Sequence, residues 1–341
     1  MNPHIAVVIP AYNVATHIHR VITSIPLKIK DIIVVDDASE DGTAAVVQST
    51  PSKRLYLLKH KKNQGVGSAM LTGYSYALEL GAKIIVKMDG DGQMDPDYLP
   101  ALIQPILDNE ADYTKGNRFF HVKELRKMPL ARRIGNLGLT FLTKLASGYW
   151  NVFDPTDGYT AIHANVLQLL DIKAIAKDYF FETSILLDLR RLQARVMDIP
   201  IPARYVDEPS SMSIAHSLIS FPGQLLHGLL KRFYQQYILS DFNTTSIYSL
   251  LSLPLLLFGI IWGLVHWYIS VNTGEVASTG TVLISVLPII LGVQFLTQAL
   301  SLDIHNIPKR AIHPHITVTN SGNTNYPLKG YWRTQTKKSS S

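Results

Sequence analysis

The amino-acid sequence predicts an α/β fold with a mainly parallel sheet, followed by two helices that span a membrane. Short, uniformly apolar runs alternate with amphipathic stretches over residues 5–120, and glycine and acidic residues follow several of these runs. Two long stretches without acidic or basic residues come after residue 246. The repeated order of strand and helix is typical of a parallel α/β sheet, and long uncharged apolar stretches are typical of membrane spans.

The apolar runs predict buried strands, because they are too short and too uniformly apolar for surface helices. These runs are Ile5–Ile9, Ile32–Val35, Leu55–Leu58 and Ile84–Val86. Helices are expected between and after them, near residues 15–24, 42–49, 66–80 and 97–108. Beyond residue 112 the pattern is mixed, with expected strands at Tyr113–Asn117 and Tyr159–Ile162 and a helix at Phe181–Arg195.

Residues 214–239 carry apolar side chains at helical spacing, and we expect an interruption at Pro222. One apolar stripe is formed by Leu225, Leu226, Leu229, Leu230 and Phe233, with Lys231 and Arg232 beside it. An amphipathic helix packed in a core has the same pattern. Because a bilayer segment follows at once, we favour a helix that lies in the membrane interface.

Two stretches are long enough to cross a bilayer. Ile247–Ile269 has 23 residues and Thr279–Leu302 has 24, and neither contains Asp, Glu, Lys or Arg. A span needs about 20 apolar residues. The alternative is a pair of buried helices in a soluble domain.

The charges around this pair predict its orientation. The connecting loop, residues 270–278, contains Glu275 and no basic residue. Basic residues flank the pair on both sides, at Lys231, Arg232, Lys309 and Arg310. Basic flanks favour the cytosol, so the loop is expected outside and the rest of the protein inside, in a cell inner membrane or the endoplasmic reticulum. The N-terminus lacks the basic and apolar regions of a cleavable signal peptide.

Composition excludes several classes of function. The chain has no cysteine, which excludes disulfides and cysteine-ligated metal sites. Its net charge is +6, but the basic residues form no single stripe and no nucleic-acid-binding motif is present, so nucleic acid is not an expected partner. The predicted division is residues 1–212 for a catalytic domain, 213–243 for interfacial helices, 244–303 for the membrane hairpin and 304–341 for a polar cytosolic tail.

The strongest local signal follows the fourth predicted strand. Asp89 and Asp91 stand two residues apart, with Gly90 between them and Gln93 after them. At a strand end, such a turn directs both carboxylates to the crevice where open α/β folds bind ligands. Hard oxygen ligands suit Mg²⁺ or Mn²⁺ bridged to substrate phosphates. The alternative is a solvated acidic turn, since Asp and Gly are the usual turn residues.

Polar residues also follow the first two strands. Asn13 comes after the first strand, and Asp36 and Asp37 come directly after the second. Ser39 or Asp41 can be explained as the cap of the next helix. Capping does not explain two adjacent carboxylates at a strand end, which repel each other and are consistent with hydrogen bonds to a base and a ribose.

Other nucleotide and hydrolase motifs are missing. Asn63–Ala69 contains Gly-x-Gly before a helix, as in a dinucleotide-binding site. The third glycine of that motif is absent, however, and the segment follows the third predicted strand, which is the wrong βα unit for the motif, so a dehydrogenase is excluded. The chain has no Walker A, His-Glu-x-x-His or Gly-x-Ser-x-Gly sequence.

Taken in order, the motifs resemble those of the family-2 glycosyltransferases. The matching pieces are VIPAYN at 8–13, VDDASEDGT at 35–43, NQGVGSA at 63–69 and DGDGQ at 89–93. Later pieces resemble the dolichyl- and polyprenyl-phosphate sugar synthases: KGNRF at 115–119, DPTDGY at 154–159, FFET at 180–183 and IPARYVDEPSS at 200–211. The resemblance covers about residues 4–240, and the hairpin agrees with it.

The resemblance implies a GT-A (Rossmann-like) fold, an inverting transfer of a hexose and a divalent ion, Mg²⁺ or Mn²⁺, on the donor diphosphate. It implies a GDP- or UDP-linked sugar as donor, polyprenyl phosphate as acceptor, and a possible homo-oligomer. The residues implied for the donor are Pro10, Tyr12, Asn13, Asp36, Asp37, Asp89, Gly90, Asp91 and Gln93, with the metal on Asp89, Asp91 and Gln93. The arginines implied for phosphates are Arg118 and Arg204 on the donor and Arg133 on the acceptor.

Two departures from the lipid-phosphate synthases bear on the acceptor. Those enzymes usually have Gly-Glu-Ser-Lys after the arginine, whereas Arg204 is followed by residues 205–212 without a lysine. Asp157 stands where they often have a small polar residue. A lipid phosphate needs no general base, whereas a hydroxyl of a glycan or glycolipid does, and Asp157 is the candidate. A non-catalytic membrane scaffold is the third alternative, and the acids at 36, 37, 89 and 91 argue against it.

Overall fold

The computed structural model describes residues 3–118, 130–202 and 214–316. The chain divides into two compact units, one formed by residues 1–228 together with 308–341, and the other by residues 229–307. The first unit contains the sheet and is called the sheet unit below. The second contains the two long apolar helices and is called the hairpin unit.

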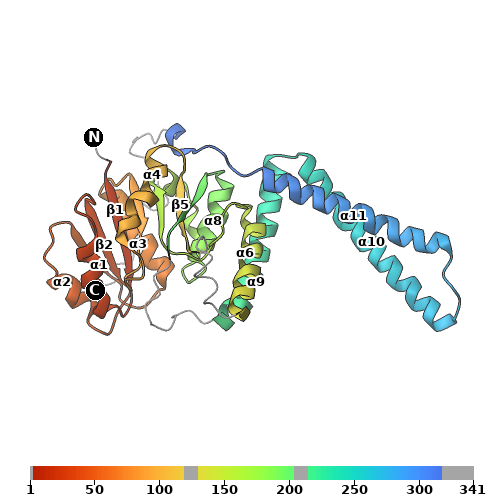
Figure 1. Cartoon of the computed structure of the whole chain (residues 1–341), viewed down its shortest axis with the longest axis horizontal. Coiled ribbons are helices and arrows are strands. Elements are labelled where there is room, and N and C mark those ends of the chain that lie inside the picture. The colour runs from red at the N-terminus through yellow and green to blue at the C-terminus, as the bar shows by residue number, and fades with distance from the viewer. Residues whose placement is uncertain (1–2, 119–129, 203–213, 317–341) are drawn as a thin grey trace. The chain divides into compact units, whose positions relative to one another are not determined.

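The sheet unit is built on one seven-stranded sheet, in which β1, β2 and β5 are labelled in Figure 1. The order of its strands is β3-β2-β1-β4-β6-β5-β7. The first four strands are β1 Ile5–Ala11, β2 Asp31–Asp36, β3 Leu55–Lys59 and β4 Ile84–Lys87. These four strands run parallel to one another, and most of their side chains are buried, as the uniformly apolar runs predict. The predicted α/β fold with a mainly parallel sheet is therefore confirmed.

The other half of the sheet contains an antiparallel strand. β6, Thr160–His163, lies between β4 and β5 and runs antiparallel to both. β5, Tyr113–Asn117, pairs in parallel with β7, Val196–Pro200, at the edge. β6 therefore starts beside the ends of β4 and β5, so the residues just before it reach the same edge of the sheet as the acidic turn after β4.

Helices cover both faces of the sheet. α1 Ala15–Ser24, α2 Thr43–Ser49 and α4 Leu99–Leu107 share a hydrophobic core with Val7, Ile9 and other alternate residues of the central strands. α3, Val66–Glu79, packs on the opposite face, where a side chain at Gly73 would come within 2.2 Å of Val8. Successive residues of a strand face opposite sides, which explains how β1 serves both layers.

The remaining elements of the sheet unit follow the central strands. They are η1 Pro96–Tyr98, α6 Leu130–Ser147, α7 Ala164–Leu167, η3 Ile172–Ala174, α8 Phe181–Arg191, the start of α9 Ile214–Phe233, and η5 His313–His315. The expected break at Pro222 is wrong, because α9 continues through it. A proline removes one backbone hydrogen bond, and a helix of 20 residues tolerates that loss.

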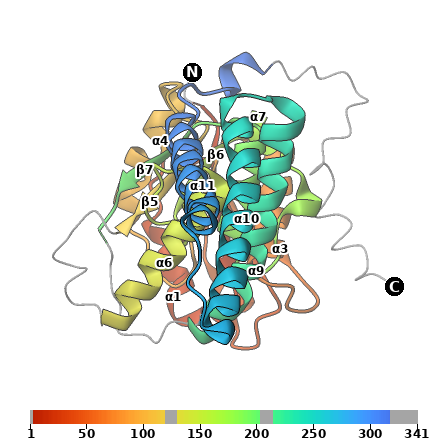
Figure 2. The ribbon, with the colours of Figure 1, turned by 90° about the vertical axis from the view of Figure 1, so that its right-hand side faces the viewer.

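The hairpin unit contains the two predicted spans. The π-helix η4 Tyr234–Ser240 leads into α10 Thr244–Thr273 and α11 Thr279–His305, which lie side by side (Figure 2). Both are long and apolar enough to cross a membrane, and few of their residues are buried within the protein. A side chain at Gly259 would come within 2.7 Å of the Ser285 carbonyl oxygen, so this glycine permits the close approach of the two helices.

An ion pair joins the ends of this unit. Arg232 of α9 donates to both carboxylate oxygens of Asp303 on α11, at 2.8 and 3.1 Å, and the Tyr237 hydroxyl also contacts Asp303. Both charged residues are buried. Arg232, which we counted among the basic flanks, is thus neutralised by Asp303, whereas Lys231 is exposed.

Residues 308–316 return to the sheet unit after α11, and we call them the C-terminal clasp. The backbone N–H groups of Ile312 and His313 donate to the carboxylate of Asp112, which is fully buried at the start of β5. The His313 ring also bonds to Asp112 and stacks on His163 with a centroid distance of 4.1 Å. The clasp is therefore an integral part of the sheet unit, and it lies within the range 304–341 that we predicted as a polar cytosolic tail.

Candidate active site

The turn after β4 lies at the carboxyl edge of the central parallel strands. A hydrogen bond closes this turn: the N–H of Gln93 donates to Asp91 Oδ1 at 2.9 Å. Gly92 has φ +78°, a conformation that favours glycine. A side chain at Gly90 would lie 3.2 Å from Val14 of the neighbouring loop, so this glycine keeps the turn close to the end of β1. The turn therefore has the position predicted for a ligand-binding edge.

Asp89 and Asp91 fit a divalent ion that is shared with a diphosphate. Burial raises the pKa of Asp91, and the neighbouring Asp89 carboxylate raises it further. A cation between them would relieve this repulsion. Within the described ranges no group of three or more His, Asp or Glu side chains can hold a metal alone. Mg²⁺ and Mn²⁺ commonly use one or two carboxylates together with substrate phosphates, which matches what Asp89 and Asp91 offer.

Lys87 is buried directly beneath this turn. Its ammonium donates to Asp89 Oδ1 at 2.6 Å and lies 3.1 Å from Glu182 Oε1 at the start of α8. Burial disfavours the charged form, but the two carboxylates outweigh it and raise the pKa of Lys87 above its usual value. Neither residue was predicted for the site. A lysine within an otherwise apolar strand is the signal that could have identified Lys87.

The loops after β1 and β2 are joined by hydrogen bonds. The N–H of Asn13, which has φ 54°, donates to Ser39 Oγ at 3.0 Å, and Asn13 Oδ1 accepts from the N–H of Glu40 at 3.0 Å. Tyr12 is exposed beside them, and Pro10 is paired within the sheet. The structure thus brings three of the predicted donor residues to one edge, with Asn13 fixing the shape of the loop.

Asp36 and Asp37 have different surroundings. Asp37 accepts the backbone N–H groups of Gln64 and Gly65, the latter at 2.8 Å, and bonds to the His60 ring at 2.7 Å. This carboxylate therefore orders the loop before α3 within the protein. Among the residues that the structure describes, the Asp36 carboxylate accepts one long bond, 3.2 Å, from the N–H of Ser39 to Oδ1. His60 was missed from the sequence, since a histidine at a strand end has no distinguishing pattern.

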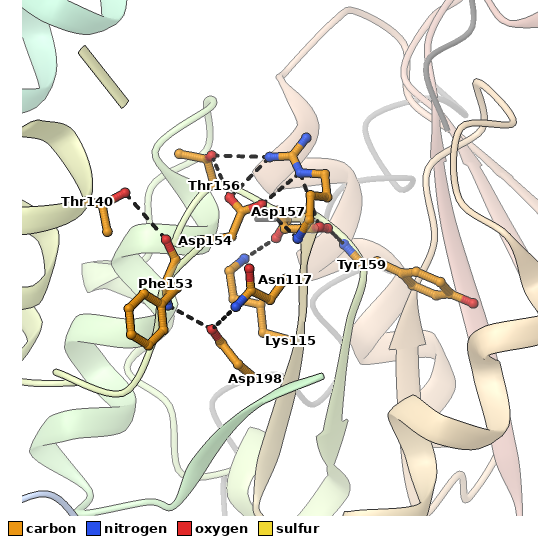
Figure 3. A network of polar contacts seen from close by, with 10 residues as sticks. Lys115, Asn117, Thr140, Phe153, Asp154, Thr156, Asp157, Tyr159 and Asp198 are labelled. Carbon is orange, nitrogen blue, oxygen red and sulfur yellow. Dashed lines mark hydrogen bonds and ion pairs between the residues drawn. The ribbon is translucent and has the colours of Figure 1, made fainter. Parts of the chain in front are cut away.

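Arg118 is held by two acidic residues that precede β6. Its guanidinium forms a two-point contact with Asp154, at 2.7 and 3.1 Å, and Nε lies 3.3 Å from Asp157 Oδ2. Asp154 and Asp157 are labelled in Figure 3. Arg118 outweighs the effect of burial and lowers the pKa of Asp154. The predicted phosphate-binding arginine is therefore oriented by Asp154, and its side chain is 40% exposed.

Asp157 lies deeper in the same network (Figure 3). Its Oδ1 accepts the N–H of Tyr159 at 2.8 Å, and its side chain is only 6% exposed. Burial raises the pKa of Asp157, against the effect of Arg118. The buried ammonium of Lys115 donates to the Asp157 carbonyl, and burial lowers the pKa of Lys115. Asp157 is thus enclosed by protein groups.

Asp198 on β7 extends the network and was not predicted. Its Oδ2 accepts from Phe153 N at 2.7 Å and from Asn117 Nδ2 at 3.0 Å, and burial raises its pKa to about 7 (Figure 3). Two other predicted residues cannot be placed. Arg204 lies outside the described residues, and so does the side chain of Arg133, although its backbone belongs to α6.

The sequence profile described as glycosyl transferase family 2 matches residues 6–170. A dolichyl-phosphate N-acetylglucosaminyltransferase from Methanococcus voltae, which uses UDP-N-acetylglucosamine, is 34% identical over 218 residues, covering 60% of this chain and 86% of that protein. This chain belongs to glycosyltransferase family 2. This chain is also similar to an undecaprenyl-phosphate mannosyltransferase from Micrococcus luteus, with 30% identity over 57% of this chain and 81% of that protein.

Solved structures support the fold of this glycosyltransferase. Glucosyl-3-phosphoglycerate synthase from Mycobacterium tuberculosis, solved with UDP, has a TM-score of 0.51 and 23% sequence identity, and the match covers 68% of this chain and 80% of that chain. The same enzyme solved with Mn²⁺, UDP and its product has a TM-score of 0.51 at 22% identity. The GT-A-like, Rossmann-type fold expected from the sequence is therefore confirmed.

Proposed function

We propose that this glycosyltransferase moves a hexose from a nucleoside diphosphate to a polyprenyl phosphate, with inversion and with Mg²⁺ or Mn²⁺, at the cytosolic face of a membrane. The observation that carries the proposal is the pair Asp89 and Asp91 at the carboxyl edge of the sheet, where burial and mutual repulsion favour a bound cation. Both relatives described above are named for sugar transfer to a polyprenyl-type phosphate.

The donor half of the reaction requires stabilisation of the leaving nucleoside diphosphate. Asp89 and Asp91 would hold the metal ion, which supplies positive charge to the diphosphate oxygens. Arg118 would add a fixed guanidinium, because Asp154 orients it while leaving part of the side chain exposed. Tyr12, exposed after β1, and Asp36 remain the proposed contacts of the nucleoside.

The surroundings of Asp157 support a phosphate acceptor. A general base must reach the proton that it removes. Asp157 is enclosed, with one oxygen on the N–H of Tyr159 and the other near Arg118. The oxygen of a lipid phosphate is already anionic near neutral pH, so the protein needs only to position it.

Features of α9 support a location at the membrane surface. Leu226, Leu230 and Tyr234 recur every four residues at the end of α9 and the start of η4, and each is more than half exposed. Lys231 is exposed beside them. An apolar stripe with a basic residue at its border is the pattern of a helix that lies in the headgroup region.

The direct test offers radiolabelled nucleotide sugars to membranes that contain the enzyme and polyprenyl phosphate. We expect label in a lipid product that mild acid releases, because a sugar on a phosphodiester is more acid-labile than an ordinary glycoside. Excess chelator should stop the reaction and Mn²⁺ or Mg²⁺ should restore it, and Asp91→Asn should be inactive while folded. Full turnover in chelator, or an acid-stable product, contradicts the proposal.

A further inference from the structure

We propose that Lys87 is a positioning residue whose ammonium holds Asp89 in the orientation that binds the donor's metal ion. The inference rests on the proposed function, because it assigns a partner to a carboxylate of the proposed metal site. Lys87 lies on β4 and is buried, so we do not expect it to touch the substrate itself.

Every donor of the Lys87 ammonium has an acceptor. Nζ lies 2.6 Å from Asp89 Oδ1, 3.1 Å from Glu182 Oε1 and 3.3 Å from the carbonyl oxygen of Gly158. A lysine ammonium has three N–H groups, and the three contacts come from the acidic turn, from α8 and from the loop before β6. The ammonium therefore fixes Asp89 with respect to two other parts of the sheet unit.

The contact between the Lys87 ammonium and Asp89 leaves no room for a side chain at position 158. A side chain at Gly158 would come within 2.3 Å of Lys87 Nζ and 2.8 Å of Asp89 Oδ2. Glycine at this position thus allows the ammonium and the carboxylate to meet beside the backbone. The same loop contains Asp157, so the contact links the proposed metal site to the network around Arg118.

Charge gives a second reason for a lysine at this position. With Asp89, Asp91 and Glu182 ionised, one ammonium leaves a formal excess of two negative charges, which equals the charge of one divalent ion. Groups that hydrogen-bond to a metal-binding side chain set its orientation, and their loss typically weakens metal binding 10–100-fold. The loss of a nearby positive charge alone would instead strengthen cation binding. A measured metal affinity therefore separates orientation from simple repulsion.

The test measures Mn²⁺ binding by the purified full-length protein in detergent with saturating UDP, from the electron paramagnetic resonance signal of free Mn²⁺. We expect Lys87→Met to bind Mn²⁺ at least about 10-fold more weakly than the wild type. Lys28→Met, which removes an exposed lysine, is the matched control and should bind normally. Glu182→Gln keeps an acceptor for Lys87 and should stay within about 3-fold of the wild type, since the Lys87–Asp89 contact remains.

A double variant separates positioning from stability. Lys87→Met alone leaves Glu182 buried without its partner and lowers the melting temperature. Lys87→Met/Glu182→Leu replaces the pair with apolar side chains and should recover the melting temperature but not the Mn²⁺ affinity. Recovery of both, wild-type affinity in Lys87→Met, or an equal loss in Glu182→Gln overturns the inference. Asp91→Asn is the reference for a protein that has lost the metal site. If the wild type itself does not bind Mn²⁺, the metal dependence in the proposed function is overturned as well.

Discussion

Asp157 is the residue at which the two acceptor chemistries give different results. Its carboxylate is hydrogen-bonded to the N–H of Tyr159 and lies beside Arg118. We expect Asp157→Asn to keep kcat within about 10-fold of the wild type, because a phosphate acceptor has no proton to lose. A catalytic base would cost about 10²-fold or more. Initial rates at saturating donor and acceptor measure the difference, and normal Mn²⁺ binding is the control for an intact site.

Gly158 offers a second residue-scale prediction. The methyl group of Gly158→Ala would overlap the Lys87 ammonium, so we expect a loss of about 1–3 kcal/mol in the free energy of unfolding and a lower activity. Gly223→Ala is the matched control, because nothing lies within 4 Å of its added carbon. Denaturant unfolding of both proteins checks this. If Gly158→Ala is as stable as the wild type, the loop before β6 can move away from Lys87.

Single residues also mark how far the sequence predicts the site. Asp89 and Asp91 could be found because their spacing and position after a strand have few explanations. The roles of Asp37 and Asp157 could not, because they depend on groups distant in the chain: His60 and Gly65 for one, Arg118 for the other. A sequence shows that a carboxylate is present but not which neighbours use its oxygens.

Among the elements, α7 carries a titratable cap. His163 Nδ1 accepts the backbone N–H of Asn165 at 3.1 Å, which requires an unprotonated nitrogen. Burial, and then the neighbouring His313, lower the pKa of His163 to about 4, while Asp112 favours the charged form and Lys83 opposes it. The unfolded chain therefore binds a proton near its ordinary pKa of 6.5, whereas the folded chain resists it until about pH 4.

The sign of this effect predicts a loss of stability in acid. The contribution of His163 is fully present above pH 6.5 and decreases as the pH falls towards 4. Because the ring is partly exposed, we expect about 1–2 kcal/mol rather than the full value of the pKa difference. His163→Asn keeps a capping oxygen that cannot be protonated, so its stability should change less between pH 7 and pH 5. Melting temperatures of the wild type and of His163→Asn, measured between pH 7 and pH 5, test this prediction. If both proteins lose the same stability over this range, the role of His163 is contradicted.

Elements differ in how well the sequence predicts them. Three of the four parallel strands, β1, β2 and β4, were predicted because a strand buried on both faces has an unbroken apolar run, and β3 was predicted from a similar run although most of its residues are only half-buried. The place of β6 between β4 and β5 was not, because strand order depends on contacts between distant segments. At Pro222 the sequence predicted a helix interruption that the structure does not have. The local rule that proline ends a helix is overridden in α9 by packing such as that of Phe221 on Phe180.

At the scale of the whole molecule, the C-terminal clasp bears on the proposed membrane topology. Residues 308–316 bind Asp112 within the sheet unit, so a hairpin that crosses a membrane must bring the chain back to the side from which it left. This requirement is met by an even number of spans, as in the proposed two-span hairpin. It does not depend on any count of charges.

Labelling can test that topology, because the chain has no cysteine of its own. A single cysteine at Asn272 should react with an impermeant thiol reagent from outside the cell, and one at Ser341 only after the cytosol is opened. Each variant should first be shown to keep transferase activity. Reaction of both positions from the same side would mean that the hairpin does not cross the membrane twice.

The clasp also has a consequence for the order in which the protein is made. Asp112 leaves the ribosome 200 residues before Ile312, and α10 and α11 are synthesised between them. Until then the carboxylate lacks the two backbone N–H groups and the imidazole that it binds in the finished protein. A chain that stops within the hairpin unit cannot supply them. Completion of the sheet unit is therefore coupled to completion of the two long helices that precede residues 308–316.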